Sequence, residues 1–307
     1  MLSKSVHYSS VFLVLCCVFN LAGCTSEAVR TPVQTPSHTE WVNTCVDWDD
    51  WDKPSPPFRI YGNSYYVGTC GITAILVTGN NGHILIDGAT EAGADVIAEN
   101  IKALGFSLND VKLLLHSHEH FDHVAGLAKL QKLSDAKLLA SLEAAPVLRS
   151  GITADVDPQA GMHEPFPPAR VDGIIKDGEV VELGNLALTS VATPGHSHGA
   201  LSWQWRSCEK ERCLSIVYAD SLSPVSRDNY HFSDHPNYVE AYQNSLNKIA
   251  GLDCQILMSP HPSSSQMRTR LSSPEGLIDP KGCIVYADNV STRLNKRLIK
   301  EQKEKAQ

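Results

Sequence analysis

The sequence predicts one α+β domain in which two β-sheets lie face to face and helices cover their outer faces. Short apolar segments typical of strands fall into two groups along the chain, and segments with helical spacing follow each group. No Pro/Ser-rich boundary separates the groups, so we assign both to the same domain. A chain of 307 residues is long enough to bury a sizeable core between two sheets.

Residues 1–24 have the pattern of a secretory signal peptide. Lys4 precedes an apolar run over residues 11–19, which is far shorter than the ~20 residues of a membrane-spanning helix. The sequence Leu-Ala-Gly-Cys then ends at Cys24 and resembles a bacterial lipobox. We therefore expect export to the periplasm and a lipid anchor at Cys24, in the outer membrane because Thr25 rather than aspartate follows. Ordinary cleavage without lipidation is the alternative.

Composition divides the rest of the chain into a linker and one domain. Residues 25–40 are rich in Thr, Pro and Ser and predict a flexible linker, which leaves residues 41–307 as the domain. Residues 41–57, crowded with Trp, Asp and Pro, predict a structured loop. The net charge is −8 and no basic stripe is present, which argues against nucleic acid as a partner. We expect a monomer that acts on a small molecule.

The cysteines beyond the leader indicate disulfides. An even number of cysteines in an exported chain favours disulfide pairing, and neighbours along the chain are the simplest pairs. A cysteine zinc site is the alternative, but no C-x-x-C spacing is present. Pairing of adjacent cysteines would join Cys45 with Cys70, Cys208 with Cys213, and Cys254 with Cys283.

The first group of strands begins with a hairpin. Two β-rich runs, residues 72–77 and 83–88, are separated by Asn and Gly. Helical spacing over residues 91–104 ends at Gly105, and residues 111–115 form the short apolar run of a buried strand. The remaining predicted elements are a helix over 124–133, a strand over 138–140, a helix over 142–149 and a Pro-rich loop over 155–170.

The second group contains more strands and ends in helices. Alternating or continuous apolar residues predict these strands, and a 3.6-residue period predicts the helices. The elements are a hairpin at 178–184, strands over 186–193, 201–205 and 214–218, a helix over 238–249, a strand over 255–258 and a helical tail from 289.

A histidine-rich segment after the strand over 111–115 predicts a metal site. Four of the thirteen histidines fall within eight residues, and imidazole together with carboxylate suits zinc. Only the frame that starts at His118 gives H-x-H-x-D-H, formed with His120, Asp122 and His123. Residues two apart in an extended segment point the same way, so His118 and His120 can bind one ion, whereas Asp122 and His123 diverge and can bind a second. His116 falls outside the frame and is expected at a strand end or behind the ligands.

Two later histidines are candidates to complete these sites. His196 follows a strand in Thr-Pro-Gly-His, and His261 follows another in Ser-Pro-His. Loops at strand ends commonly carry catalytic groups on a rigid scaffold. Three protein ligands for each ion leave positions open for water, whose pKa falls to about 7 on zinc.

With these residues the sequence resembles the metallo-β-lactamase superfamily, and in particular the third subclass of the class B β-lactamases. The resemblance runs from about residue 60 to 285 and includes Ile-Leu-Ile-Asp-Gly at 84–88. The H-x-H-x-D-H motif marks only the superfamily, whereas Ser-Leu-Ser at 221–223 and Phe-Pro-Pro at 166–168 narrow it to this subclass. The other two subclasses place a zinc-binding cysteine where Ser221 falls, and no cysteine lies nearby.

The resemblance implies an αβ/βα sandwich that binds two Zn²⁺ ions and hydrolyses the β-lactam ring of penicillins, cephalosporins and carbapenems, conferring antibiotic resistance. A hydroxide between the metals would attack the lactam carbonyl, and Asp122 would orient it. Ser221 and Ser223 would bind the substrate carboxylate. Cys208–Cys213 and Cys254–Cys283 also fit pairings in this subclass, and some of its members have a third pair like Cys45–Cys70. The first zinc would be held by His118, His120 and His196, and the second by Asp122, His123 and His261.

Other functions compete with this one. The closest rival is another zinc hydrolase of the same fold, a glyoxalase-type thioesterase or a lactonase, for which Asp220 would be the bridging aspartate. A zinc-binding lipoprotein without activity would instead have closed four-ligand sites. Gly-His-Ser-His-Gly at 195–199 and Ser-Asp-Ala-Lys at 134–137 match serine-hydrolase motifs, but a strand rather than a helix is predicted after the first. The sequence assigns no role to Gln159, His163 and Tyr230.

Overall fold

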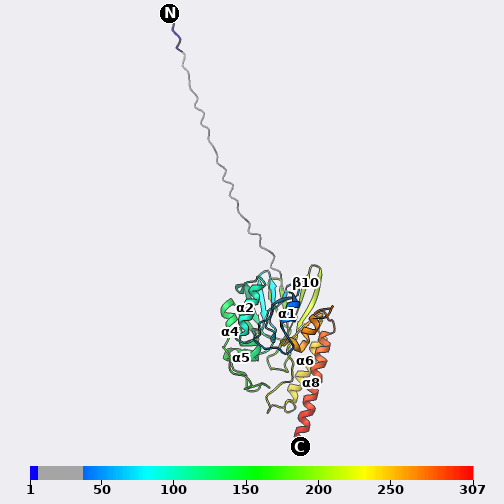
Figure 1. The fold of residues 1–307 in the computed structure, drawn as a ribbon. Coiled ribbons are helices and arrows are strands. Elements are labelled where there is room, and N and C mark those ends of the chain that lie inside the picture. Colours follow the sequence, from blue (N-terminus) through cyan, green and yellow to red (C-terminus); the bar gives the residue numbers. More distant parts are fainter. Residues whose placement is uncertain (6–36, 307) are drawn as a thin grey trace. The chain divides into compact units, whose positions relative to one another are not determined.

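The computed structural model describes residues 1–5 and 37–306 (Figure 1). Cys24, most of the predicted leader and residues 25–36 of the predicted linker lie outside the described residues. Residues 37–306 belong to one compact unit. None of the helices in the described part combines the length and the apolar character that crossing a membrane would require.

The first sheet has seven strands in chain order. Strands β1 to β4 pair antiparallel, and β4 to β7 pair parallel. Parallel neighbours need crossover connections, which place helices on one face of the sheet. The strands are β1 (Phe58–Tyr61), β2 (Ser64–Tyr66), β3 (Ile75–Gly79), β4 (Gly82–Ile86), β5 (Val111–Leu115), β6 (Lys137–Ser141) and β7 (Val171–Ile175).

The second sheet has five strands in the order β12-β11-β10-β9-β8. All its pairs are antiparallel except β11 with β12. The strands are β8 (Val180–Leu183), β9 (Leu186–Ala192), β10 (Leu201–Glu209), β11 (Arg212–Tyr218) and β12 (Ile256–Met258).

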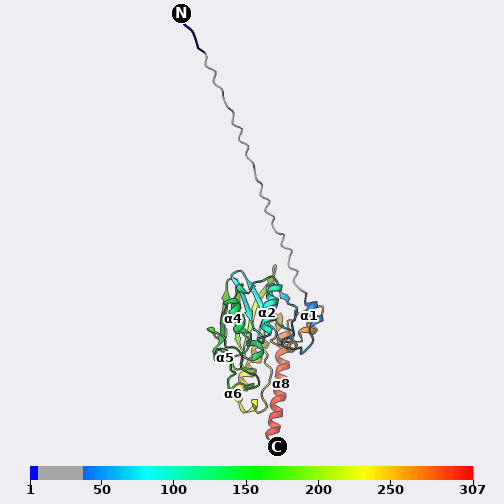
Figure 2. The same cartoon turned by 60° about the vertical axis from the view of Figure 1, so that its left-hand side comes forward.

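The helices cover the outer faces of the two sheets (Figures 1 and 2). Helices α2, α4 and α5 pack on the first sheet, and α6 and α8 pack on the second. The α-helices are α1 (His38–Thr44), α2 (Gly93–Ala103), α3 (Phe121–Val124), α4 (Leu127–Ser134), α5 (Ala144–Ser150), α6 (Pro236–Gly251), α7 (Met267–Leu271) and α8 (Gly282–Lys305). The 3₁₀ helices are η1 (Leu108–Asp110), η2 (Phe232–Asp234) and η3 (Pro262–Ser265).

Side-chain alternation along the strands separates three apolar layers. Ile75 and Val77 point inward and pack against Trp203 and Ile216 of the second sheet. Leu76 points to the opposite face, into the layer beneath the first set of helices, because successive strand residues face opposite sides. The four-layer αβ/βα sandwich predicted from the sequence is therefore confirmed.

Some predicted boundaries are wrong. The helix predicted over 124–133 is two helices, α3 and α4, separated at Ala125 and Gly126. A Cβ on Gly126 would lie 2.1 Å from the carbonyl oxygen of Gly88, so the chain can pass this close to the end of β4 only with glycine. This approach holds the metal segment against the first sheet.

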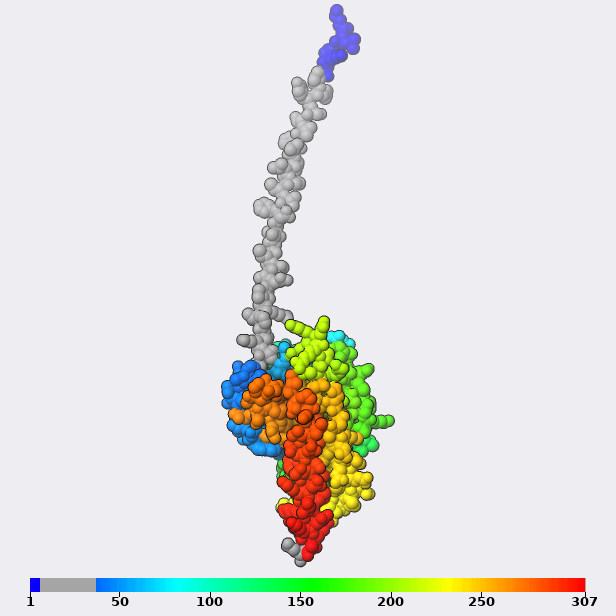
Figure 3. Space-filling view, turned by 90° about the vertical axis from the view of Figure 1, so that its right-hand side faces the viewer, coloured from blue at the N-terminus to red at the C-terminus, as the bar shows by residue number. Residues whose placement is uncertain are grey.

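Three other boundaries differ from the prediction. Helix α1 begins at His38, inside the predicted linker, so the folded part starts before residue 41. The predicted hairpin at 178–184 is a single strand, β8, which pairs with β9 across a turn at Gly184. Helix α8 begins at Gly282, well before residue 289, and Figure 3 shows it in red along the surface beside α6.

Candidate active site

The predicted site residues meet at one edge of the sandwich. The H-x-H-x-D-H segment follows β5, and its last residues begin α3. His196 follows β9, Ser221 follows β11 and His261 follows β12. Strands from both sheets therefore end at the same place, which brings residues far apart in sequence together.

The first donor group consists of His118, His120 and His196. Their ring nitrogens lie within 4.8 Å of one another, and His120 Nδ1 is 3.2 Å from His196 Nε2. His118 Nε2 is buried and has no hydrogen-bond partner among the described residues. Ligand atoms of a tetrahedral zinc site lie about 3.3 Å apart when each bond is about 2.0–2.1 Å. The spacing and the unpartnered nitrogen both fit a metal ion.

The second group consists of Asp122, His123 and His261. Asp122 Oδ2 lies 3.1 Å from His123 Nε2 and 3.2 Å from His261 Nε2, and the two nitrogens are 3.4 Å apart. His118 also falls in a donor cluster with Asp122 and His123. The two groups are thus adjacent, and each supplies three ligand atoms.

Electrostatics prepares Asp122, His118 and His196 to bind a cation. Burial alone would raise the pKa of Asp122, but His123 and His261 outweigh it and hold the pKa well below its usual value. Burial lowers the pKa values of His118 and His196 well below 6.5. An ionised carboxylate and neutral imidazoles are the forms that coordinate metals. At the other two shifted ligands, Asp157 raises the pKa of His120 and Asp122 raises that of His123 to about 10, against the effect of burial, so a metal would displace a proton there.

Carboxylates stand behind two ligands of the first group. Asp220 Oδ1 lies 2.8 Å from His118 Nδ1, and Asp157 Oδ1 lies 3.0 Å from His120 Nε2. Such contacts on the second ring nitrogen set the tautomer and orientation of a ligating imidazole. Asp157 is not identifiable from the sequence, because no motif marks this position in the Pro-rich loop.

Asp87 and His116 connect the metal segment to the sheets. Asp87 accepts hydrogen bonds from Ser117 N at 2.6 Å and from Tyr218 OH at 2.6 Å, and it lies 3.5 Å from His123 Nδ1. His116 Nε2 accepts from Ser141 N at 3.2 Å, and burial lowers the pKa of His116 to about 4. His116 therefore lies behind the ligands, as expected from the motif frame.

The Gly-His-Ser-His-Gly motif at 195–199 has a structural role, because two of its residues donate hydrogen bonds to Glu119. Ser197 Oγ donates to Glu119 Oε2 at 2.6 Å, and Gly199 N donates to Oε1 at 2.8 Å. Ser197 is fully buried, and a strand follows Gly199 rather than a helix. The serine is a structural link to the metal segment and has no access to a substrate.

The Ser-Leu-Ser turn places Ser221 and Ser223 in the lining of the site. Leu222 has a φ of 46°, an uncommon left-handed conformation that carries strain. Asp220 Oδ2 accepts from Leu222 N, and Tyr242 OH donates to Leu222 O, so both sides of the turn are held. Ser221 Oγ is buried without a partner among the described residues. Such a hydroxyl is ready to bind a polar group of a ligand.

A cavity of about 360 Å³ opens over both donor groups. Gln159 Nε2 lies 3.3 Å from His196 Nε2, and the His163 ring lies 5.7 Å from that of Trp51. Tyr230 is not among the lining residues, and its ring stacks on His235 instead. The cavity is lined by Trp48, Trp51, His120, Asp122, Gln159, His163, His196, Ser221, Ser223, Val225, His261, Ser264 and Arg293.

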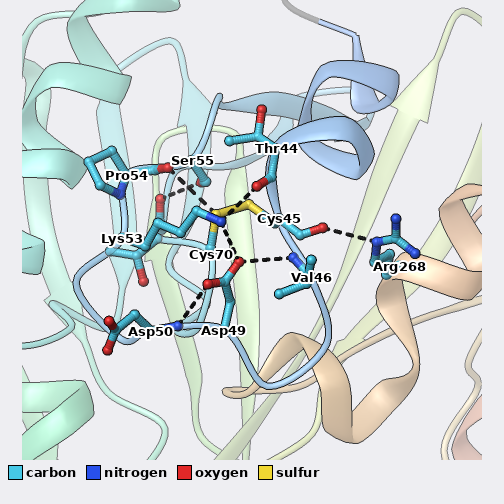
Figure 4. Close-up of a disulfide and its surroundings, with 12 residues drawn as sticks. Thr44, Cys45, Val46, Asp49, Asp50, Lys53, Pro54, Ser55, Cys70 and Arg268 are labelled. Carbon is cyan, nitrogen blue, oxygen red and sulfur yellow. Dashed lines mark hydrogen bonds and ion pairs between the residues drawn. A yellow bond between two sulfur atoms is a disulfide. The ribbon is translucent and has the colours of Figure 1, made fainter.

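The loop that carries both tryptophans is braced by a disulfide (Figure 4). Cys45 and Cys70 are bonded, and Lys53 Nζ donates to Asp49 Oδ2 and to Thr44 O, each at 2.8 Å. The other two predicted disulfides, Cys208–Cys213 and Cys254–Cys283, are also formed. No free thiolate remains at Cys45 or Cys70 for a metal.

Comparisons with known proteins agree with this geometry. A family model of the metallo-beta-lactamase superfamily matches residues 67–209. The structure is similar to that of the MIM-2 metallo-beta-lactamase, with a TM-score of 0.84 and 56% identity over 87% of this chain and 99% of that chain. It is also similar to MEM-A1, a subclass B3 metallo-beta-lactamase isolated from a soil metagenome library, with a TM-score of 0.80 and 42% identity over 83% of this chain and 100% of that chain.

Curated relatives match a shorter part of the chain. A hydroxyacylglutathione hydrolase from Bradyrhizobium sp. (strain ORS 278) is 29% identical over 131 residues, which are 40% of this chain and 42% of the relative. The chain spans about half or less of the length of these curated relatives.

Proposed function

Because the chain belongs to the metallo-β-lactamase superfamily, and within it to the subclass B3 enzymes, we propose that it hydrolyses the β-lactam ring of penicillins, cephalosporins and carbapenems. The observation that carries the proposal is the position of Ser221 and Ser223 in the cavity that members of both donor groups also line. These hydroxyls suit the carboxylate that accompanies the lactam ring in such antibiotics.

The two donor groups suit two zinc ions. Five imidazoles and one carboxylate are a typical zinc donor set, and three protein ligands for each ion leave a position open. When bound, zinc supplies Lewis acidity that polarises a carbonyl and activates water at neutral pH. The proposed ligands are His118, His120 and His196 for one ion, and Asp122, His123 and His261 for the other.

Asp122 has a second task besides binding metal. Its Oδ2 faces His123 and His261, so Oδ1 is left to accept a hydrogen bond from the attacking water and to orient it. Its depressed pKa keeps the carboxylate ionised for this role. A proton taken by this oxygen can then pass to the lactam nitrogen as the C–N bond breaks.

Aromatic side chains shape the rest of the cavity. Trp48 and Trp51 form one wall, with their rings 6.5 Å and 6.2 Å from that of His261. The apolar faces of these rings can pack on the bicyclic part of a substrate, while the serines bind its carboxylate.

The placement of Asp220 argues against the thioesterase or lactonase alternative. As a bridging ligand, this aspartate would have to lie between the two donor groups. Its Oδ1 instead contacts His118 Nδ1, on the opposite side of the ring from the unpartnered Nε2, and its Oδ2 accepts from Leu222 N. Both oxygens are therefore directed away from the space between the groups.

A substrate panel tests the proposed function. Zinc-loaded protein is given benzylpenicillin, a carbapenem, an acyl-homoserine lactone and a glutathione thioester, and kcat/KM is measured for each. We expect both lactams to be hydrolysed at least a hundredfold more efficiently than the other two compounds. Turnover of the thioester or the lactone without turnover of either lactam would reject the β-lactamase assignment.

Export and lipid attachment at Cys24 are part of the same proposal. Three disulfides support export, because such bonds persist in oxidising compartments, and the lipobox-like sequence before Cys24 supports lipid attachment. Labelling cells with a radioactive fatty acid should mark the wild-type protein but not the Cys24→Ser variant. Equal labelling of both proteins, or of neither, would contradict the lipid anchor.

A further inference from the structure

Helix α8 binds the loop that follows β11 through polar side chains on one of its faces. Tyr286 OH donates to the carbonyl oxygen of Ser221 at 2.7 Å. About three turns further along, Arg297 Nη2 donates to the carbonyl oxygen of Tyr230 at 3.0 Å. The helix is therefore anchored to both ends of the segment that contains the Ser-Leu-Ser turn.

Arg293 lies on the same face between these two anchors. Positions 286, 293 and 297 are spaced seven and four residues apart, which places them on one side of a helix. The side chain lines the cavity together with Ser221 and Ser223.

The charge of Arg293 is not satisfied by another residue. Its guanidinium makes no hydrogen bond or ion pair with any described residue, unlike that of Arg297, which pairs with Glu301 at 2.6 Å. Among the described residues that line the cavity, Arg293 is the only lysine or arginine. An unpaired guanidinium that lines the same cavity as Ser221, whose hydroxyl has no partner among the described residues, favours an anionic ligand.

We propose that Arg293 binds the substrate carboxylate, and that the hydroxyls of Ser221 and Ser223 complete this subsite. The inference rests on the proposed function and extends it, because it makes the chain selective for lactams that carry a negative charge beside the ring. A guanidinium presents parallel N–H groups that match the two oxygens of a carboxylate, so the interaction orients the substrate as well as attracting it.

The test compares a charged and a neutral substrate in matched variants. Zinc-loaded wild type, Arg293→Gln, Arg293→Lys and the control Lys296→Gln are assayed with benzylpenicillin and with its methyl ester. Lys296 is an exposed residue of the same helix outside the cavity lining, so the control removes the same charge elsewhere. Thermal midpoints and zinc content are measured for each protein.

We expect Arg293→Gln to raise KM for benzylpenicillin about ten- to a hundredfold, the loss typical of a hydrogen bond to a charged group, with kcat within about threefold. KM for the ester should change less than about twofold, Arg293→Lys should recover part of the loss, and Lys296→Gln should match wild type. Equal effects on acid and ester, or no change in KM for the acid, would overturn the assignment of Arg293.

The same proteins distinguish a failure of the proposed lactamase function from a failure of the proposed role of Arg293. If the zinc-loaded wild type hydrolyses no lactam, benzylpenicillin stays intact in its presence. Isothermal titration calorimetry can then measure how tightly benzylpenicillin binds. Binding that weakens at least tenfold in Arg293→Gln but not in Lys296→Gln would support the subsite without the lactamase activity. Undetectable binding to the wild type, or equal binding to both variants, would overturn it.

Discussion

A single carboxylate oxygen joins a proposed metal ligand to the loop above the site. Asp157 Oδ1 lies 3.0 Å from His120 Nε2 and also accepts from Gln159 N at 2.7 Å. Gln159 Nε2 in turn lies 3.3 Å from His196 Nε2. The loop conformation and the metal site are thus coupled through one residue, and metal binding should depend on both.

Removing this carboxylate should weaken the metal site. We expect Asp157→Ala to lower affinity for zinc at the first group about ten- to a hundredfold, as is common when the partner of a ligating histidine is lost. Asp157→Asn should lose less, because its amide oxygen can still accept a hydrogen bond from His120. Competition with a chromogenic chelator measures the affinities. The exposed Asp155, changed to Ala, is the control, and an equal loss in that variant would contradict the role of Asp157.

The site residues that the metal motif predicts lie close together in the sequence, whereas the site residues that could not be predicted lie far from it along the chain. His118, His120, Asp122 and His123 are close in sequence, and their spacing alone indicates a metal site. Asp157 is 37 residues from His120, in a loop without periodicity. Arg293 looks like any exposed residue of a polar helix until the structure places it in the cavity. Long-range contacts of this kind leave no local pattern to detect.

At the scale of elements, α8 is a brace and more than the polar tail that the sequence predicts. Glu301 is fully buried and accepts hydrogen bonds from Phe232 N at 3.2 Å, Ser233 N at 2.8 Å and Arg297 Nε at 2.6 Å. The polar sequence of the helix does not indicate that Glu301 is buried, because its hydrogen-bond partners include backbone groups of η2 that are distant in sequence. The helix therefore fixes the loop that begins at the Ser-Leu-Ser turn.

This contact predicts a pH-dependent contribution to stability. Burial would raise the pKa of Glu301, but the hydrogen bonds from Ser233 and Arg297 outweigh it and lower the pKa below 4.5. A carboxylate with a depressed pKa stabilises the fold above its unfolded pKa, and this stabilisation is lost as pH falls through the folded pKa. At pH 7, Glu301→Gln should destabilise the metal-free protein by about 1–3 kcal/mol, and the difference should shrink below pH 4.5.

Denaturant unfolding of metal-free wild type and variant between pH 3 and 7 measures the difference. Glu304→Gln is the matched control, because Glu304 is exposed and only 3.6 Å from Lys300 at the surface, where an ion pair contributes little. A Glu301→Gln deficit that stays constant across this pH range would show that the carboxylate charge is not what stabilises η2.

The disulfide at the tryptophan loop gives another element-scale prediction. Cys45 and Cys70 are 25 residues apart, whereas Cys208 and Cys213 are 5 apart within the β10–β11 hairpin. A crosslink restricts the unfolded chain more when it closes a longer loop, so losing the first pair should cost about 3.5 kcal/mol and losing the second about 2 kcal/mol.

The two double Cys→Ser variants serve as each other's control. The Cys45/Cys70 variant should also raise KM for a lactam, because the wall formed by Trp48 and Trp51 loses its brace, whereas the Cys208/Cys213 variant should keep the wild-type KM. Denaturant unfolding and steady-state kinetics measure these effects. An unchanged KM in the first variant would show that the loop holds its shape without the crosslink.

At the scale of the whole molecule, the sandwich was predictable because strand-like apolar segments fall into two groups along the chain and helical segments follow each group. The layer that each strand residue enters was not predictable here, because Ile75, Leu76 and Val77 are all apolar, yet Ile75 and Val77 enter the central core and Leu76 the helix-covered layer. The break at Gly126 was not predictable, since it reflects the approach of the distant Gly88 carbonyl. Which donors face which ion likewise depends on how four strand ends meet.

Metal ions at these strand ends are proposed to catalyse lactam hydrolysis. The most direct measurement is benzylpenicillin hydrolysis by the purified protein before chelator treatment, after it, and during stepwise return of zinc. We predict that activity disappears on chelation and returns to the starting rate as zinc approaches two ions per chain. Hydrolysis that persists in the metal-free protein, or a fully zinc-loaded protein that leaves the lactam intact, would contradict the account.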